Sequence, residues 1–143
     1  MNRDFTLLET LVTLLIAGLI LAFAVPRLGE MLDRVAVSAA AREIAAAHSR
    51  ARVIAVTEGR VSLLSVRPDS LVLLVIEGTD TVARWAAPGP AAAGIALSGP
   101  ARPLMLAPTG VGFGVSNATY TLSRGMAARQ VIMSRWLRVR IVP

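Results

Sequence analysis

Residues 5–25 read FTLLETLVTLLIAGLILAFAV and contain a single ionisable side chain, Glu9. As a helix with a rise of about 1.5 Å per residue, this stretch would be about 31 Å long, which matches a hydrocarbon core of about 30 Å. A buried core helix of this length would need apolar partners on every side, and a chain of 143 residues leaves too little sequence to supply them. The stretch therefore predicts a membrane-spanning helix.

A cleaved secretory signal is the first alternative for this stretch. Residues 22–24 read Ala-Phe-Ala, the small-x-small form that signal peptidase reads, and Arg3 lies in a short leading segment. Against this interpretation, Glu9 interrupts the apolar run, the run exceeds the usual length of roughly 7–15 residues, and Pro26 follows closely. A secreted β-domain beginning at Val25 stays open as the less favoured alternative.

Glu9 is the one residue of the apolar run whose transfer into a membrane is energetically unfavourable. A carboxylate is expensive inside a membrane and usually faces a partner or marks a function. An ammonium group is the partner that such a carboxylate needs in a low dielectric. The sequence therefore predicts that Glu9 is neutralised by a positive charge from outside its own helix.

The start of the chain carries a resemblance to a known family. Residues 5–9, Phe-Thr-Leu-Leu-Glu, followed by an apolar run that closes in Ala-Val-Pro at 24–26, resemble the class III signal of type IV pilins and type II secretion pseudopilins. The resemblance implies that a prepilin peptidase cuts before Phe5 and methylates the new amine. It also implies that Glu9 pairs with the N-terminal amine of a neighbouring subunit, and it makes Glu9 and Pro26 the expected assembly residues.

The residue before the expected cut departs from the family pattern. The family has Gly at this place, whereas the chain has Asp4, so residues 1–4 form an unusual leader. Three outcomes stay open: an uncut membrane anchor, a peptidase that tolerates Asp4, or a change in the sequence itself.

Beyond the membrane stretch, residues 26–58 predict an amphipathic continuation of the helix. Pro26 is expected to kink or locally melt it, and Gly59 is a plausible stop, so the helix should run from about Thr6 to about Glu58. His48 has no second histidine or acidic cluster nearby and is expected to be a surface or boundary residue rather than a metal ligand. The apolar stripe comprises Leu28, Met31, Leu32, Val35, Ala39, Ile44, Ala47, Ala51 and Ile54.

The end of this helix limits the resemblance to one branch of the family. Residues 51–61, ARVIAVTEGRV, resemble the GspH/FimT branch of the pseudopilins, in which an Ala-Arg pair, a further Ala and a Gly lead into the first strand. The chain is thereby similar to the minor, H-type subunits.

Residues 60–143 predict a β-rich domain. Short β-like runs occur at 61–66, 71–76, 81–86, 104–107, 111–115, 118–123, 129–134 and 136–142. Residues 87–103, rich in Pro, Gly and Ala, predict a long surface loop with at most a weak strand around 95–97. The expected fold class is α+β: a long N-terminal transmembrane and amphipathic helix followed by a two-sheet, sandwich-like pilin domain.

Charge divides the chain into two parts. Residues 1–80 contain eight Arg and nine acids, net −1, whereas residues 81–143 contain seven Arg and no acid, net +7. In the last strand, Trp136, Arg138 and Arg140 alternate with apolar residues, and Arg135 lies beside them. Such a face either protects a β edge or contacts an anion, for example the phosphates of DNA. The resemblance supports the second interpretation in part, because FimT-like minor pilins bind DNA through Gly-Arg-x-Arg, and residues 137–140 read Leu-Arg-Val-Arg.

The sequence favours assembly over catalysis. It has no cysteine, no nucleophile paired with a base and no metal-ligand cluster, so neither an enzyme nor a cofactor is predicted. The resemblance implies a minor pseudopilin of type II secretion in a short periplasmic filament, anchored in the bacterial inner membrane by one span. Its implied partners are other pseudopilins or pilins, the inner-membrane assembly platform and the prepilin peptidase. A FimT-like type IV minor pilin that binds DNA during uptake is the alternative.

Overall fold

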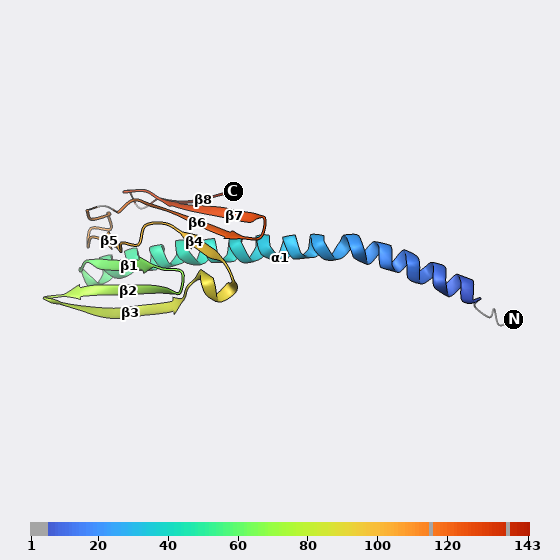
Figure 1. Ribbon diagram of the computed structural model, residues 1–143. Coiled ribbons are helices and arrows are strands. Elements are labelled where there is room, and N and C mark those ends of the chain that lie inside the picture. The colour runs from blue at the N-terminus through green and yellow to red at the C-terminus, as the bar shows by residue number, and fades with distance from the viewer. Residues whose placement is uncertain (1–5, 115, 137) are drawn as a thin grey trace. The chain divides into compact units, whose positions relative to one another are not determined.

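The computed structural model describes residues 6–114, 116–136 and 138–143. The chain divides into two compact units, residues 1–32 and 33–143. Helix α1 (Leu7–Glu58) contributes to both units, and the remaining elements belong to the second unit (Figure 1). They are β1 (Ser62–Val66), β2 (Ser70–Glu77), β3 (Asp80–Pro88), the 3₁₀ helix η1 (Pro90–Ala93), β4 (Ala96–Ser98), β5 (Leu104–Leu106), β6 (Ala118–Arg124), β7 (Ala127–Met133) and β8 (Val139–Val142).

Helix α1 begins and ends close to the predicted residues. Its end at Glu58 is followed by Gly59 with φ of 62°, a left-handed conformation that glycine adopts without steric cost. The N–H of Arg60 then donates to the carbonyl of Ala55 over 3.1 Å, which closes the last turn. Of the two expected effects of Pro26, a kink or local melting, the second does not occur, because α1 continues through Pro26.

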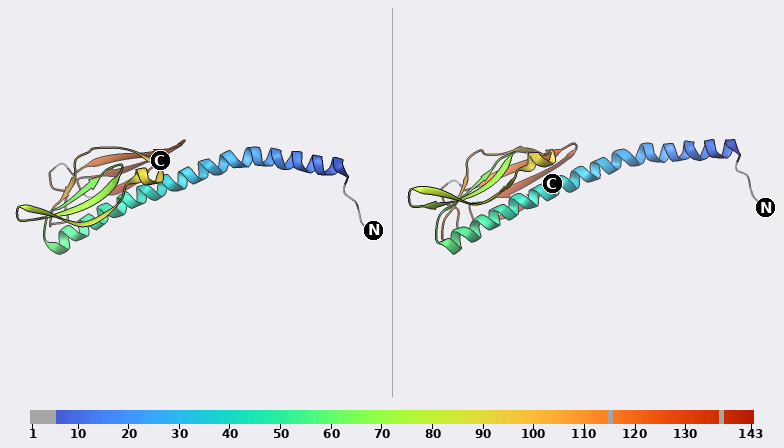
Figure 2. Two further views of the ribbon diagram at one scale, coloured as in Figure 1. Left: turned by 60° about the horizontal axis from the view of Figure 1, so that its bottom comes forward. Right: turned by 90° about the horizontal axis from the view of Figure 1, so that it is seen from below.

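In the second unit, one face of α1 packs against both sheets (Figure 2). Its buried residues recur every three or four positions: Val37, Ala41, Ile44, Ala47, His48, Ala51 and Ala55. Four of these are alanines, whose small side chains let strands approach the helix closely. The core is completed by Leu64, Leu71 and Leu73 of the first sheet and by Tyr120, Leu122 and Val131 of the second.

The two sheets have four strands each and are antiparallel between all neighbours. The first has the order β3-β2-β1-β5 and the second the order β4-β6-β7-β8. In β1 and β2 the buried and partly exposed residues alternate, which is the pattern of strands that cover a core on one face. The predicted α+β class, a long helix followed by two sheets, is confirmed.

Two of the predicted β runs differ from the observed strands. Residues 111–114 form no strand and contribute only an isolated bridge between Leu106 and Gly112, because the left-handed Gly110 and Gly114 turn the chain on either side. The last strand begins at Val139 rather than at Trp136, because Trp136 lies in the turn that precedes β8.

The region 87–103 is more ordered than the predicted surface loop. It contains η1 and the short strand β4, which pairs with β6. Ile95 is buried in the core, and the N–H of Gly89 donates to the carbonyl of Asp69 over 2.8 Å. Despite its Pro- and Ala-rich composition, this region therefore forms an ordered connection between the first sheet and the second.

Candidate assembly helix and arginine cavity

The first turn of α1 is capped by Thr6. Its Oγ1 accepts a hydrogen bond from the backbone N–H of Glu9 over 3.3 Å, and its carbonyl accepts from the same N–H over 3.0 Å. This is the Thr-x-x-Glu arrangement of a helix N-terminus, in which Gln can stand in place of Glu. A carboxylate here also interacts favourably with the helix dipole. Glu9 is therefore compatible with its own helix, although capping does not require its charge.

The carboxylate of Glu9 has no ion pair within residues 6–114, 116–136 and 138–143. Asp4 and Phe5, the residues of the expected cleavage site, lie outside the described residues. The predicted neutralisation of Glu9 therefore stays a prediction.

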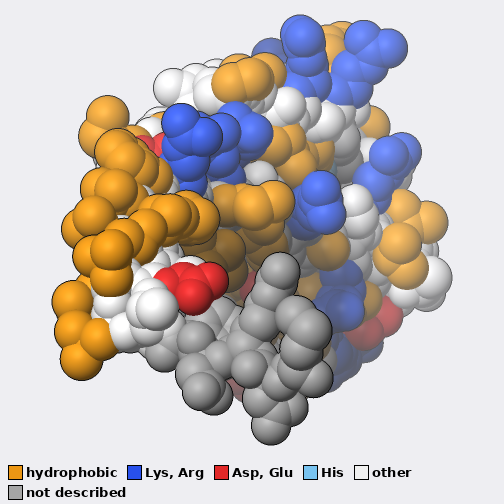
Figure 3. Space-filling model, turned by 90° about the vertical axis from the view of Figure 1, so that its right-hand side faces the viewer, with side chains coloured by type: hydrophobic (Ala, Val, Ile, Leu, Met, Phe, Trp, Pro, Cys, Tyr) orange, Lys and Arg blue, Asp and Glu red, His pale blue; other side chains and the backbone are white. Residues whose placement is uncertain are grey.

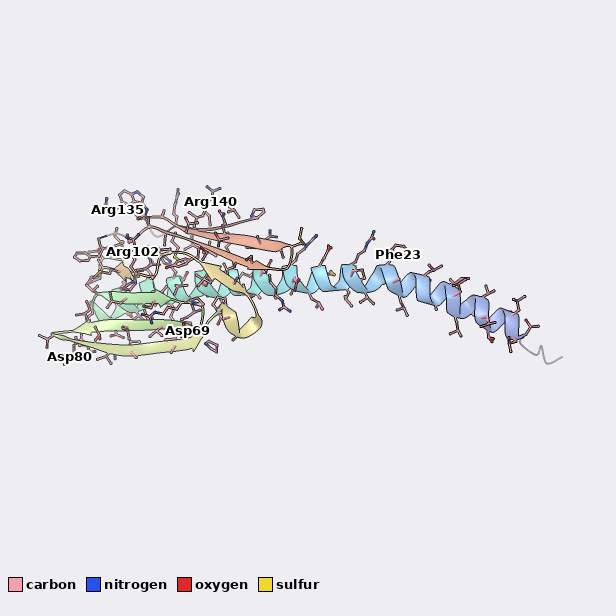
Figure 4. The ribbon with its side chains drawn as sticks, viewed as in Figure 1. Phe23, Asp69, Asp80, Arg102, Arg135 and Arg140 are labelled. Atoms are coloured by element: carbon pink, nitrogen blue, oxygen red, sulfur yellow. The ribbon has the colours of Figure 1, made fainter. Side chains whose placement is uncertain are left out.

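The helix of the first unit presents apolar side chains to its surroundings. Phe23, for example, is 72% exposed (Figure 4). Among the described residues, α1 alone is long and apolar enough to cross a membrane, with a mean hydropathy of 2.4 in its most apolar window. Its length and composition match a membrane anchor.

A second apolar face of α1 lies in the second unit, on the side that the sheets leave uncovered. Its members are exposed and follow a spacing of three or four residues: Val35, Ala39, Arg42, Ala46, Ser49, Val53 and Val56. We call this set the outer helix face. Val35 is 60% exposed and Val53 is 58% exposed, although β-branched apolar residues are normally buried. Of the predicted apolar stripe, Val35 and Ala39 are exposed, whereas Ile44, Ala47 and Ala51 are buried within the second unit.

His48 is buried, contrary to the prediction of a surface or boundary residue. It is 2% exposed, and its Nε2 has no hydrogen-bond partner among the described residues. Burial, and to a lesser extent the positive charge of Arg52, lower the pKa of His48. The described residues contain no group of three or more His, Cys, Asp or Glu side chains that could hold a metal ion.

A partly polar cavity lies at one end of the second sheet. Its volume is about 780 Å³, and it is lined by Pro100, Arg102, Gly114, Asn117, Ala118, Thr119, Ile132, Met133, Ser134 and Arg135. We call it the arginine cavity. One guanidinium N–H of Arg102 donates to the carbonyl of Asn117 over 3.1 Å, which holds this side chain at the cavity. The lining contains two arginines and no acid.

The turn between β7 and β8 positions Arg135 at this cavity. The N–H of Ser134 donates to the carbonyl of Arg138 over 2.9 Å, and the N–H of Arg138 donates to the Ser134 hydroxyl over 3.1 Å. The turn thus exposes Arg135 and also Trp136, which is 78% exposed.

Arg140 flanks the same cavity across the sheet. In the β7–β8 register it is the direct partner of Ile132, which lines the cavity, and Ile132 pairs in turn with Thr119. The sequence-predicted Arg135 and Arg138 lie in the β7–β8 turn and Arg140 lies in β8, so all three belong to the second sheet and its last turn; Figure 4 shows Arg135 and Arg140 on this sheet. Their predicted contact with an anion stays a prediction.

Arg102 was not among the predicted site residues. It precedes β5 and reaches the cavity because the chain between β4 and β5 passes beside the start of β6. In the sequence, the feature that could have indicated Arg102 is its position between two prolines, in the half of the chain that contains no acids.

Charges elsewhere in the second unit are largely compensated. The guanidinium of Arg84 donates a hydrogen bond to the Glu58 carboxylate, with Nε 3.0 Å from Oε1, and it also forms an ion pair with Glu77. The hydrogen bond from Arg84 lowers the pKa of Glu58. Arg124 pairs with Asp33, whereas Arg102 and Arg135 have no acidic partner within the described part of the chain.

Arginine and acid side chains are unevenly distributed over the surface. Blue arginine side chains predominate over red acidic ones on the face shown in Figure 3. Asp69 and Asp80 lie at the turns of the first sheet, whereas Arg135 and Arg140 lie on the second (Figure 4). Of the arginines in residues 81–143, Arg102 and Arg135 line the arginine cavity.

Comparison with known proteins identifies the architecture. No model of a protein family matches the chain, and no curated protein matches it in sequence. Among solved structures, it is similar to the type IV minor pilin FimU of Pseudomonas aeruginosa, with a TM-score of 0.63 and 18% identity over 75% of this chain and 88% of that one. It is also similar to the minor pseudopilin EpsH from the Type 2 Secretion System of Vibrio cholerae, with a TM-score of 0.59 and 12% identity over 74% of this chain and 95% of that one.

These similarities agree with the resemblance carried by residues 5–9 and 51–61. At this level of identity they concern the fold rather than the system in which the protein acts. The chain has the GspH/FimT-type, pilin-like fold that is found in type IV minor pilins and in type II minor pseudopilins.

Proposed function

We propose that the protein is a non-enzymatic, pilin-like subunit that assembles with other pilins or pseudopilins through α1. The observation that carries this proposal is the outer helix face. A helix whose inner face is fully packed, and whose outer face still exposes Val35, Val53 and Val56, has apolar area to bury against another protein. This face belongs to the same helix as the apolar residues of the first unit, so helices of neighbouring subunits could pack along the whole length of α1.

Glu9 supplies the specificity of this assembly. After cleavage before Phe5, the new N-terminal amine of one subunit neutralises the Glu9 carboxylate of its neighbour inside the membrane. The proposal is supported by the lack of any ion pair to Glu9 among the described residues. It is also supported by the cost of an unpaired carboxylate in lipid.

Within this class we favour a minor pseudopilin of type II secretion. Such a subunit is held in the bacterial inner membrane by α1, with residues 60–143 in the periplasm, and joins a short filament that works with an inner-membrane assembly platform. The likeness to a minor pseudopilin over 95% of that chain supports this assignment.

A type IV minor pilin that takes part in DNA uptake is the second candidate. It is favoured by the likeness to FimU and by the arginines around the cavity. Binding of duplex DNA by the full-length protein in neutral detergent micelles, measured at low and high salt, tests it. Salt-sensitive binding that is lost on Arg138→Ala with Arg140→Ala would support DNA uptake, and absence of binding would exclude direct DNA contact.

Deletion of the gene in its native host distinguishes the two systems. A pseudopilin predicts that folded secretion substrates accumulate in the periplasm and that surface pili are unchanged. A type IV minor pilin predicts the reverse. Complementation with the wild-type chain must restore the lost activity, and a deletion that affects neither process would contradict both assignments.

A further inference from the structure

The arginine cavity has a composition that the assembly helix does not explain. It lies on the second sheet, and its lining is about half apolar, with Pro100, Ala118, Ile132 and Met133 beside the arginines. The guanidinium of Arg102 is held by the carbonyl of Asn117, so its direction is fixed before any ligand arrives. A cation whose position is set in this way loses less conformational freedom on binding.

We propose that the arginine cavity binds a carboxylate on an acidic segment of a partner protein in the same assembly. Guanidinium groups bind carboxylates through paired hydrogen bonds, and Arg102 and Arg135 present two of them to one cavity. With no acid in the lining and none between residues 81 and 143, charge complementarity favours an anionic ligand.

The apolar lining favours a protein segment over a phosphodiester backbone. Pro100 and Ile132, which are partly exposed, would contact apolar side chains next to the carboxylate, whereas a phosphate and its sugar bring little aliphatic surface to bury. On the same sheet, Arg124 is taken up by Asp33 and by the carbonyl of Ala93 and does not extend this group of arginines.

The rim of the cavity has the residue types of a protein interface. Trp136 is 78% exposed and Phe113 is 54% exposed. Their loops are adjacent, since a Cβ on Gly112 would lie 3.0 Å from the carbonyl oxygen of Arg135. Exposed Trp and Arg residues around a pocket are typical of positions that dominate binding energy between proteins.

The inference rests on the proposed function only in requiring a partner protein, and its test does not require filament assembly. Full-length protein in neutral detergent micelles is titrated against a fluorescent peptide of alternating Glu and Leu, with the matching Gln and Leu peptide as control. We expect binding of the acidic peptide and none of its amide counterpart.

Paired variants test whether the cavity is responsible. Arg102→Gln with Arg135→Gln should weaken binding of the acidic peptide at least about tenfold, because both guanidinium partners are lost. Arg42→Gln with Arg129→Gln removes the same total charge at positions that do not line the cavity and should change the affinity less than about twofold. Circular dichroism of each variant verifies that the fold is retained.

Three results would overturn the inference. Equal weakening in both double variants would mean that the peptide senses only net charge. Absence of peptide binding by folded wild-type protein would exclude an acidic protein ligand. Binding of duplex DNA that depends on Arg102 and Arg135 and displaces the peptide would assign the cavity to nucleic acid phosphates instead.

Discussion

Asp33 and Arg124 form an ion pair, with Oδ1 and Nε 2.9 Å apart. The pair joins helix α1, at the first residue of the second unit, to the β6–β7 hairpin. The same arginine donates to the carbonyl of Ala93 over 2.9 Å. The next residue, Gly125, has φ of 55°, and a Cβ there would lie 2.5 Å from Oδ2 of Asp33. One arginine therefore connects α1, η1 and the second sheet.

Arg124→Gln should lower the stability of the second unit. The loss of a partly exposed ion pair and of one hydrogen bond to a carbonyl is expected to cost about 1 kcal/mol, and thus to lower Tm by about 4–8 °C. Thermal unfolding of the full-length protein in detergent, followed by circular dichroism in the β-sheet region, measures this. Arg67→Gln, on an exposed arginine without an ion pair among the described residues, should leave Tm unchanged, and an equal effect of both variants would refute the assigned role.

The second unit should lose stability as the pH falls below about 6.5, the ordinary pKa of histidine. Burial lowers the pKa of His48 in the folded protein, so the unfolded chain takes up a proton first and is stabilised by it. The effect is readily attributed because His48 is the only histidine. Tm measured between neutral and mildly acidic pH should fall in the wild type and fall much less in His48→Leu. Identical pH profiles would mean that His48 is not the group responsible.

The outer helix face should contact neighbouring subunits. The chain has no cysteine, so Ala46→Cys introduces a unique site for a photoreactive maleimide on this face. Illumination in cells should crosslink this variant to other pilin-like subunits. Ala86→Cys, an equally exposed alanine on the edge strand β3, is the matched control and should crosslink far less. Comparable yields from the two positions would contradict a specific helix contact.

Asp4→Gly should increase the processed fraction of the protein. The family places a small residue before the cut, and the side chain of Asp4 is both larger and charged. Intact-mass analysis of protein from the native host distinguishes chains that start at Met1, Phe5 or Val25. We expect the variant to shift the population toward Phe5 with a methylated amine. A wild-type chain that starts at Val25 would instead identify a signal-peptidase product.

The helix and most strands could be predicted from the sequence because their signals are local. The change from helical to alternating periodicity occurs at Gly59, and the structure places the end of α1 there. The prediction of a strand is wrong for residues 111–114 because apolar residues between glycines also occur in turns, and the positive φ of Gly110 and Gly114 is not visible in the alternation.

The helical spacing of the sequence indicates that His48 is buried, although histidine is a polar residue. Position 48 follows Ile44 by four residues and precedes Ala51 by three, so it lies on the buried stripe of α1. Val35 and Ala39 are exposed because each lies two residues before a buried position, Val37 or Ala41, and therefore on the opposite side of α1.

The arginine cavity required the tertiary structure. Arg135, Arg138 and Arg140 are close in sequence, but Arg102 comes from a different loop and meets Arg135 only because β6 and β7 pair side by side. The apolar part of the lining, including Ile132, likewise depends on strand register. Sequence alone could therefore predict basic residues but not a cavity.

Incorporation of Glu9→Gln into filaments in the native host tests the assembly mechanism most directly. Gln preserves the size of the side chain and remains compatible with the cap formed by Thr6, so only the negative charge is removed. Thr13→Val, one turn further along α1, is the control. The account predicts that Glu9→Gln remains in the membrane fraction while Thr13→Val and the wild type are recovered in sheared filaments. Recovery of Glu9→Gln in filaments at the wild-type level would contradict it.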